Sequence, residues 1–327
     1  MGVALAERAN PLALRAVVGG GFSTMRRSPL HHDIVLLITG PTGNVGAELV
    51  DILAGLPDIV PRRIASRHAH ADPRDDATVQ RIGFDFFDRT TWDAALSGVT
   101  RLFLLFPLPG NRAARQAVIP FIHAAQDAGC SHIVYVSVFG ADRARFIPHY
   151  LVEQALHESS MTWTVLRCSF FMQNLHRHIS THGVDIADRG ELFIPAGGGR
   201  TTFLDARDAA AVAALALLDP GAHRNAVHHL TGPEALTMEQ VAAALTEELG
   251  YPVTYPHPGL IAFARRLRRR HVGWDTIGFM AAVYTLTRFG LNQPITDDVS
   301  RLLDRPPRDF ATFLHDKAWR WRERAWT

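Results

Sequence analysis

Three glycines between residues 40 and 46 have the spacing of a phosphate-binding loop. The loop reads GPTGNVG from Gly40 to Gly46, after an apolar run and before a segment of helical periodicity. The first glycine permits a tight turn, the second lets the backbone approach a pyrophosphate, and the third lets helix and strand pack closely. Free N–H groups at a helix start also favour an anion. With a purely structural turn as the alternative, the sequence predicts a dinucleotide site formed by Gly40, Thr42, Gly43, Asn44, Val45 and Gly46.

The end of the next apolar run indicates which dinucleotide binds. Ser66 and Arg67 stand where an acidic residue would bind the ribose 2′-hydroxyl of NAD. An arginine beside a hydroxyl can instead pair with a 2′-phosphate, so NADP(H) is favoured over NAD(H). The alternative is that Arg67 is an ordinary solvated arginine, one of 33 in the chain.

Two further pairs of residues follow strand-like runs and extend the predicted cofactor site. Asp85 and Phe86 come after the third run, where a carboxylate and a ring face could meet the adenine. Phe106 and Pro107 end the fourth run and would lie under the nicotinamide. These positions follow from the rule that ligands of open α/β sheets bind at the carboxyl ends of the strands.

A cluster after the sixth strand-like run has the composition of a substrate pocket. Phe170, Phe171 and Met172 are large and apolar, and Asn174 adds one polar group. Pockets for hydrophobic small molecules combine such walls with few polar contacts. Ordinary core packing is the alternative for each residue taken singly.

Strand-like and helical segments alternate through the first half of the chain. The strand-like runs are residues 34–38, 63–66, 81–84, 102–106, 132–138 and 162–166, and the helical stretches are 45–53, 91–96, 112–128 and 148–158. This alternation predicts right-handed βαβ units and an α/β fold with a doubly wound parallel sheet. Residues 201–204 and 226–230 flank an alanine-rich helix, 206–218, and are predicted to return to that sheet or its edge.

The chain after Gly232 reads as mostly helical. Thr237 is the expected N-cap of a helix over 238–249, and further helices are expected around 260–271, 277–289, 297–303 and 310–321. We therefore expect a dinucleotide-binding domain of 33–167 plus about 200–231. A smaller substrate-side lobe would comprise about 168–199 plus 232–327. Residues 1–32 are arginine-rich and are expected to be a mobile tail or to precede the true start, with a transit peptide as the alternative.

Composition excludes several classes of protein. The chain has 327 residues, and its formal charge of +2 lacks the basic excess typical of nucleic-acid binding. Only two cysteines are present, and scattered histidines lack partners at metal-ligand spacing, so no metal site is expected. The longest apolar run is about half the ~20 residues of a membrane span. We expect a cytoplasmic protein with a small-molecule substrate and no nucleic-acid or membrane partner, either a monomer or a dimer.

Several longer stretches carry a family resemblance. The matching segments are 38–46 (ITGPTGNVG), 164–175 (TVLRCSFFMQNL), 196–208 (AGGGRTTFLDARD), 231–244 (TGPEALTMEQVAAA) and 305–313 (RPPRDFATF). In these the chain resembles the NmrA-like group of atypical short-chain dehydrogenases. Residues 65–67 (ASR) and 84–88 (FDFFD) are similar to the branch that includes fungal ergot-alkaloid reductases acting on iminium intermediates. The chain departs from the family pattern at Pro41, commonly Ala, and at Cys168, usually Pro.

The resemblance implies a Rossmann domain with a small helical lobe and binding of NADP(H) or NAD(H). Family members are either reductases or redox-sensing regulators without turnover. Typical short-chain dehydrogenases use a Tyr four residues before a Lys as their acid–base couple. The only lysine of this chain is Lys317, so that couple is not available.

Two other residues are the candidates for catalysis. His149 could donate a proton near neutral pH, oriented by Glu153 one helical turn away, with an ordinary helix pair as the alternative. Ser137 ends the fifth run, where typical family members keep a catalytic serine, and it could instead only hydrogen-bond the cofactor's amide.

Taken together, these observations predict an NADPH-dependent reductase of a hydrophobic iminium, quinone or enone. Hydride transfer to such electrophilic acceptors depends mainly on how the cofactor and the acceptor are positioned, and less on a proton donor in the protein. The alternatives are a non-catalytic NADP(H)-sensing regulator that binds a protein partner, and a redox-neutral isomerase or cyclase on the same fold.

Overall fold

The computed structural model describes residues 34–56, 60–106, 110–176, 181–318 and 321. The expected tail over 1–32 lies outside the described residues, as does Pro107, one of the predicted cofactor contacts.

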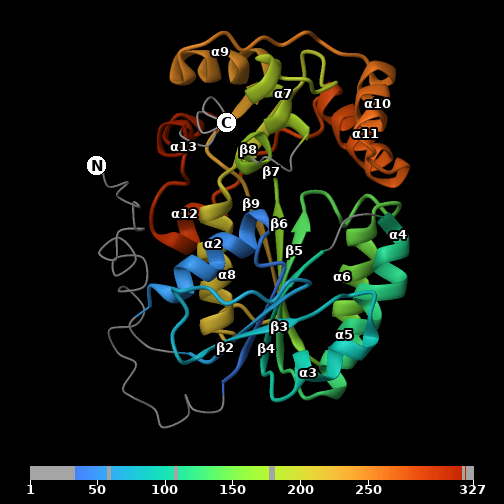
Figure 1. Ribbon diagram of the computed structural model, residues 1–327, viewed down its shortest axis with the longest axis vertical. Coiled ribbons are helices and arrows are strands. Elements are labelled where there is room, and N and C mark those ends of the chain that lie inside the picture. Colours follow the sequence, from blue (N-terminus) through green and yellow to red (C-terminus); the bar gives the residue numbers. More distant parts are fainter. Residues whose placement is uncertain (1–33, 57–59, 107–109, 177–180, 319–320, 322–327) are drawn as a thin grey trace.

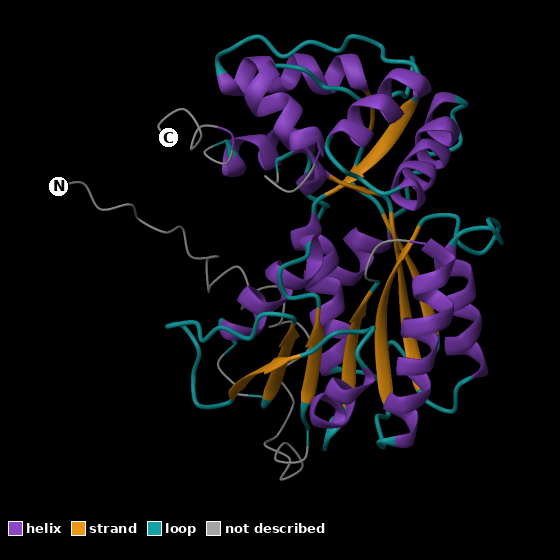
Figure 2. Ribbon diagram, turned by 45° about the vertical axis from the view of Figure 1, so that its right-hand side comes forward, coloured by secondary structure: helices purple, strands orange, loops and turns teal. Residues whose placement is uncertain are grey.

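Seven parallel strands form the main sheet, in the order β3-β2-β1-β4-β5-β6-β9. Figure 2 shows them as the orange arrows of the larger domain, with helices on both sides. This confirms the predicted doubly wound α/β fold. The strands are β1 (Leu36–Thr39), β2 (Arg62–Ser66), β3 (Val79–Gly83), β4 (Arg101–Leu105), β5 (His132–Val138), β6 (Thr162–Cys168) and β9 (Ala226–Leu230).

Helices cover both faces of this sheet, which is why its central strands read as continuous apolar runs. One face packs against α2 (Asn44–Ala54) and α8 (Ala206–Leu218), and the other against α3 (Trp92–Leu96), α5 (Ile119–Asp127) and α6 (Pro148–Glu158). All four residues of β1 are buried. The polar groups that could meet a ligand are therefore left to the strand ends.

The expected helix over 112–128 is interrupted. It consists of α4 (Gly110–Ala113), a π-helical turn (Ala114–Val118) and α5. Pro120 lies in the first turn of α5 and has no N–H to donate to the turn before it. The wider π turn accommodates this missing hydrogen bond.

The smaller lobe combines helices with a second, three-stranded sheet in the order β10-β8-β7. Its strands are β7 (Phe170–Phe171), β8 (Arg200–Leu204) and β10 (Ala235–Thr237). Its helices share one apolar core and stand above the larger domain in Figure 1. They are α7 (Thr181–Arg189), α9 (Met238–Leu249), α10 (Leu260–Arg269), α11 (Trp274–Arg288) and α13 (Phe310–Lys317).

The prediction that 201–204 returns to the main sheet is wrong. Residues 226–230 do return, as edge strand β9 beside β6, but β8 pairs with β10 and β7. The reason is packing, because the Phe203 ring lies 5.3 Å from that of Phe170 and 5.4 Å from that of Phe310. These rings belong to the core of the smaller lobe, so β8 extends that lobe.

A buried carboxylate on α8 anchors the connection to α13. Asp208 is fully buried, and its oxygens accept hydrogen bonds from the Arg305 Nη2 at 2.7 Å, from the Arg308 backbone N–H at 2.8 Å and from the Arg308 guanidinium. The two arginines follow α12 (Asp298–Leu303), which packs against α8. This contact fixes the segment RPPRDF against the larger domain.

Asp208→Asn should therefore destabilise the protein strongly. The substitution removes charge-assisted hydrogen bonds to Arg305 and Arg308, whose side chains are 25% and 32% exposed, so it should cost about 1.5–3 kcal/mol. The free energy of unfolding from urea titration measures the loss. Asp304→Asn is the matched control, because Asp304 is exposed and should change stability by less than about 0.5 kcal/mol. Equal effects of the two substitutions would contradict the anchoring role.

Candidate functional site

The glycine loop lies between β1 and α2, at the carboxyl edge of the main sheet. Gly40 has a φ of +61°, and the Gly43 N–H donates to the Gly40 carbonyl at 2.9 Å. A Cβ at Gly46 would lie 2.1 Å from that carbonyl oxygen, so no other residue fits there. Val45 is buried against the sheet, which leaves the loop backbone as the surface a phosphate could meet.

The start of α2 is tied to the segment that follows the sixth strand. The Asn44 Nδ2 donates to the Asn174 Oδ1 at 2.7 Å, across 130 positions of the chain. We predicted these residues as cofactor and substrate contacts respectively, and the structure brings them together. Their contact links the phosphate loop to the turn over Met172–Leu175.

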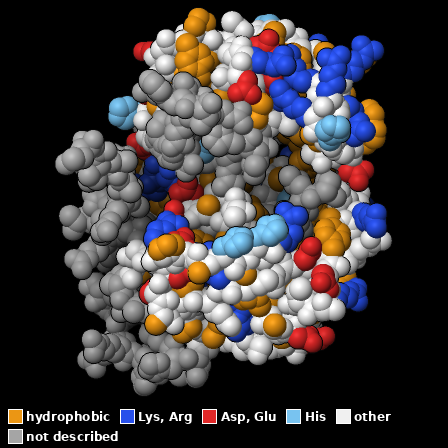
Figure 3. All heavy atoms as spheres, viewed as in Figure 1, with side chains coloured by type: hydrophobic (Ala, Val, Ile, Leu, Met, Phe, Trp, Pro, Cys, Tyr) orange, Lys and Arg blue, Asp and Glu red, His pale blue; other side chains and the backbone are white. Residues whose placement is uncertain are grey.

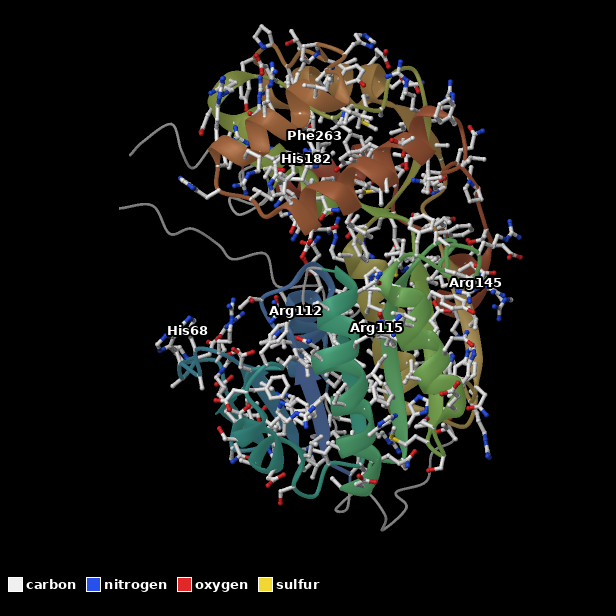
Figure 4. All side chains as sticks on the ribbon, turned by 90° about the vertical axis from the view of Figure 1, so that its right-hand side faces the viewer. His68, Arg112, Arg115, Arg145, His182 and Phe263 are labelled. Carbon is white, nitrogen blue, oxygen red and sulfur yellow. The ribbon has the colours of Figure 1, made fainter. Side chains whose placement is uncertain are left out.

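Arg67 stands free at the end of β2. It is exposed, and within the described part of the chain its guanidinium has no hydrogen-bond or ion-pair partner. The Ser66 hydroxyl, in contrast, is already bound to the His68 carbonyl at 2.8 Å. His68 and His70 follow, with their rings stacked 6.1 Å apart, and His68 lies on the rim of the larger domain (Figure 4). These two histidines were not among the predicted site residues, although they follow Arg67 closely in the sequence.

The residues after β3 differ from expectation in one respect. The Asp85 carboxylate accepts a hydrogen bond from the Phe87 N–H at 2.9 Å and remains half-buried. The Phe86 ring, however, packs against Phe84 at 4.8 Å and Phe121 at 5.3 Å. It therefore faces the core, which differs from the expectation that its ring meets the adenine.

Ser137 belongs to a buried polar cluster with Glu153 and Arg167. The Ser137 hydroxyl donates to the Glu153 Oε1 at 2.5 Å, and the Arg167 guanidinium donates to both Glu153 oxygens, at 3.2 and 2.6 Å. All three residues are buried. Ser137 and Arg167 are direct neighbours across β5 and β6, so both can reach the same carboxylate on α6. The proposal that Glu153 orients His149 is wrong, because its oxygens are used in this cluster.

His149 is instead held by Tyr135. The phenol oxygen lies 2.7 Å from the Nδ1 of His149, and the Phe106 ring centroid is 5.0 Å from the imidazole. Burial lowers the pKa of His149 from its usual 6.5 to about 4. His149 is therefore neutral at pH 7, which differs from the expected proton donor titrating near neutrality.

The predicted substrate residues differ in how deeply they are buried. Phe170 and Phe171 are half-buried, but Met172 is fully buried in the core of the smaller lobe. Beside it, the Gln173 amide donates to the Asp205 carboxylate and accepts from the Ala206 N–H, a role that the sequence pattern does not predict. Of the four predicted substrate residues, Phe170, Phe171 and Asn174 thus keep part of their surface accessible, whereas Met172 does not.

Five of the six residues from 265 to 270, at the end of α10, are arginines, and they mostly form ion pairs or face solvent. Arg266 and Arg270 form ion pairs with Asp185 at 3.0 and 2.5 Å, and Arg265 and Arg269 are exposed. Figure 3 shows Lys and Arg side chains gathered at this upper right part of the molecule. No cluster of three metal-ligating side chains occurs among the described residues, and none of the helices described is long and apolar enough to cross a membrane.

Comparisons with known proteins identify relatives along nearly the whole chain. A model of the NmrA-like family matches residues 32–314. The NAD(P)H azoreductase of Xenophilus azovorans is 34% identical over 285 residues, which cover 85% of this chain and 96% of that protein. Quinone oxidoreductase 2 of Escherichia coli is 30% identical, covering 72% and 81%. Agroclavine dehydrogenase of Claviceps fusiformis is 27% identical, covering 86% and 97%.

Solved structures show the same fold. The triphenylmethane reductase of Citrobacter sp., complexed with NADP(H), superposes with a TM-score of 0.70 at 22% identity. The match covers 87% of this chain and 99% of that one.

The buried histidines should make stability depend on pH. Burial lowers the pKa of His149 and of His182 to about 4 in the folded protein. In the unfolded chain each imidazole has its ordinary pKa near 6.5 and therefore binds a proton at a higher pH. The free energy of unfolding should therefore fall as the pH drops from 6.5 to 4, by up to about 1.4 kcal/mol per pH unit for each histidine.

Urea unfolding at pH 7.5 and pH 5 measures this difference. His182→Gln should make it smaller, whereas His315→Gln, an exposed control, should leave it unchanged. A pH response that both variants share with the original protein would contradict the assignment to His182.

Proposed function

The chain belongs to the NmrA-like family, and from this premise we propose that it is an NADPH-dependent reductase of hydrophobic small molecules. Its acceptors would be already electrophilic, such as a quinone, an enone or an iminium ion. The observation that carries the proposal is the arrangement along one sheet edge. The phosphate loop follows β1, and Arg67, which has no ion-pair partner among the described residues, follows β2. Phe106 follows β4, Ser137 lies near the end of β5, and His149 lies at the start of α6.

The residues present fit a dinucleotide. Gly43 is the N-cap of α2 and has no side chain, so among the described residues no side-chain cap binds the first N–H groups of the helix, and these suit a pyrophosphate. The free guanidinium of Arg67 suits the 2′-phosphate that distinguishes NADPH from NADH. NADPH, when bound, supplies a hydride and leaves as NADP⁺.

The relatives support a reductase. One is named an NAD(P)H azoreductase and another a quinone oxidoreductase, and both share at least 30% of their residues with this chain over the aligned region. The agroclavine dehydrogenases also match over most of their length. These names describe different acceptors, so they support the reaction class and not one substrate.

The acid–base groups restrict the acceptor. Helix α6 offers His149/Glu153 and Tyr150/Gln154 at the four-residue spacing, whereas Lys317 lies in α13 beside Glu48 at 3.8 Å. The Tyr–Lys couple that serves alcohol and ketone chemistry is thus missing from the sequence. An acceptor that is already electron-poor takes hydride without prior protonation, and water can supply the proton afterwards.

A non-catalytic NADP(H) sensor is the second candidate function. It is favoured by the engagement of Ser137 with Glu153 at 2.5 Å, because a hydroxyl whose proton is committed to a carboxylate is not available to a substrate. Under this alternative the same edge would bind NADPH but no acceptor.

Turnover measurements separate the two functions. We expect NADPH oxidation, followed by its absorbance, with at least one of a naphthoquinone, a cyclic enone and a cyclic iminium salt, with product formation confirmed by mass spectrometry. Tight NADPH binding in calorimetry without turnover of any acceptor, together with a co-purifying protein, would favour the sensor instead.

Cofactor choice should depend on Arg67. Arg67→Ala should weaken NADPH binding by about 2 kcal/mol, roughly 30-fold, because a charge-assisted contact is lost, and should leave NADH binding almost unchanged. Calorimetric titration with both cofactors measures the effect. Arg224→Ala is the matched control, an exposed arginine before β9 and thus at the opposite end of the sheet. Equal weakening of both cofactors by Arg67→Ala would show that Arg67 does not contact the 2′-phosphate.

A further inference from the structure

Tyr135 and His149 form a buried pair whose consequence goes beyond the proposed function. Tyr135 lies in the middle of β5 and is fully buried, on the face of the sheet that α6 covers. His149 lies in the first turn of α6, at the carboxyl edge of the sheet. The phenol oxygen and the Nδ1 of His149 are 2.7 Å apart, which is the distance of a short, direct hydrogen bond.

We propose that Tyr135 is a positioning residue that fixes His149 as a neutral hydrogen-bond donor, with its proton on Nε2 and directed at an oxygen of the substrate. This proposal rests on the proposed reductase function and narrows its substrate class. Acceptors with a carbonyl oxygen, namely quinones and enones, would be favoured over iminium ions.

The position of the proton follows from the partners of the phenol. If Tyr135 donates to Nδ1, the neutral ring carries its proton on Nε2. If Nδ1 carried the proton and donated to the phenol oxygen, the phenol proton would need another acceptor. Within the described residues Tyr135 has no other hydrogen-bond partner. The second arrangement would leave the phenol O–H buried without an acceptor, and this would make it about ten- to hundredfold less populated than the first. The tautomer with its proton on Nε2 is therefore favoured.

The surroundings keep the imidazole neutral. The groups seen against it are the uncharged rings of Phe106, at 5.0 Å, and Tyr135, at 5.8 Å between centroids. Glu153, the carboxylate on the same helix, is bound to Arg167 and Ser137, and no hydrogen bond joins it to His149 within the described residues. Burial lowers the pKa of His149 to about 4 and raises that of the Tyr135 phenol well above 10, so neither group ionises at physiological pH.

The Nε2 atom is the free end of the ring. It makes no hydrogen bond within the described part of the chain, and it is not among the fully enclosed polar atoms without a partner. Phe106, whose ring lies against the imidazole, directly follows β4 and is one of the two residues expected to lie under the nicotinamide. The N–H of Nε2 is thus available to a molecule bound at this edge.

The chemistry of the acceptor decides whether this donor helps. When a quinone or enone accepts a hydride, two electrons enter its conjugated system and negative charge grows on its oxygen. An N–H donor stabilises that oxygen, and a proton from water then completes the product while the imidazole keeps its own. The nitrogen of an iminium ion has no lone pair to accept a hydrogen bond. An N–H donor therefore gives its reduction less help than it gives the reduction of a quinone or an enone.

The tautomer can be observed directly, without any substrate. In the full-length protein labelled with ¹⁵N-histidine, long-range ¹H–¹⁵N spectra should show for His149 an unprotonated Nδ1 and a protonated Nε2, unchanged between pH 5.5 and pH 8. Comparison with His149→Gln assigns the signals. A protonated Nδ1, or titration within this range, would overturn the proposal even if the protein is an active reductase.

Kinetic variants test the role in turnover. His149→Ala should lower kcat for a naphthoquinone about 100-fold, the loss expected when a donor to a developing oxyanion is removed, and change turnover of a cyclic iminium salt much less. His149→Gln, whose amide can still donate, should recover part of the quinone rate. Equal losses with both acceptors, or no recovery with Gln, would overturn the donor role.

Tyr135→Phe completes the test. It should lower kcat for the quinone about tenfold without changing the KM for NADPH, and the histidine spectrum should show a mixture of tautomers. Tyr255→Phe is the matched control, since its hydroxyl binds the Ile194 and Gly197 carbonyls in the smaller lobe. An unchanged His149 spectrum in Tyr135→Phe would overturn the positioning role. A failure of the reductase function itself would show differently, as absence of turnover by the original protein with every acceptor.

Discussion

Burial of the main sheet on both faces is the constraint on which the rest of the molecule depends. With α2 and α8 on one face and α3, α5 and α6 on the other, the central strands β1, β4 and β5 are accessible mainly at their ends. A polar group inside this sandwich must find a partner within it, because an unpaired buried polar group is costly. Ser137 with Glu153 and Arg167, and Tyr135 with His149, are such pairings. Pairing of buried polar groups thus stabilises the fold and also determines which functional groups can still bind a ligand.

The same constraint explains how much of the fold could be predicted from the sequence. Strands covered on both faces are mostly apolar, and β5 is apolar except at His132 and Ser137, so it was found at its observed bounds. The helix α6, which begins at Pro148, was also found at its observed bounds. Strand β8 was placed in the wrong sheet because its pairing depends on the contact of Phe203 with Phe170 and Phe310, which no local pattern encodes. The helix α7 was not predicted at all.

The candidate site divides in a similar way. The glycine loop is a local feature, with the tight packing of Gly46 on Gly40 only six positions apart, and the sequence was sufficient to recognise it. The contact of Asn44 with Asn174 joins residues 130 positions apart, and Glu153 reaches Ser137 rather than the His149 on its own helix. Spacing along one helix identifies residues that can meet, but a neighbouring strand competes for them. Side-chain roles in such a site are therefore set by topology more than by motif.

The single lysine gives the molecule an unusual chemical property. The Lys317 Nζ lies 3.8 Å from the Glu48 carboxylate, at the joint where α13 of the smaller lobe meets α2 of the larger domain. Its side chain is only 19% exposed. Reagents that acylate primary amines would thus have one side-chain target in the entire protein, and that amine is shielded only while the two lobes stay together. The rate of its acylation would report on the separation of the lobes without any engineered label.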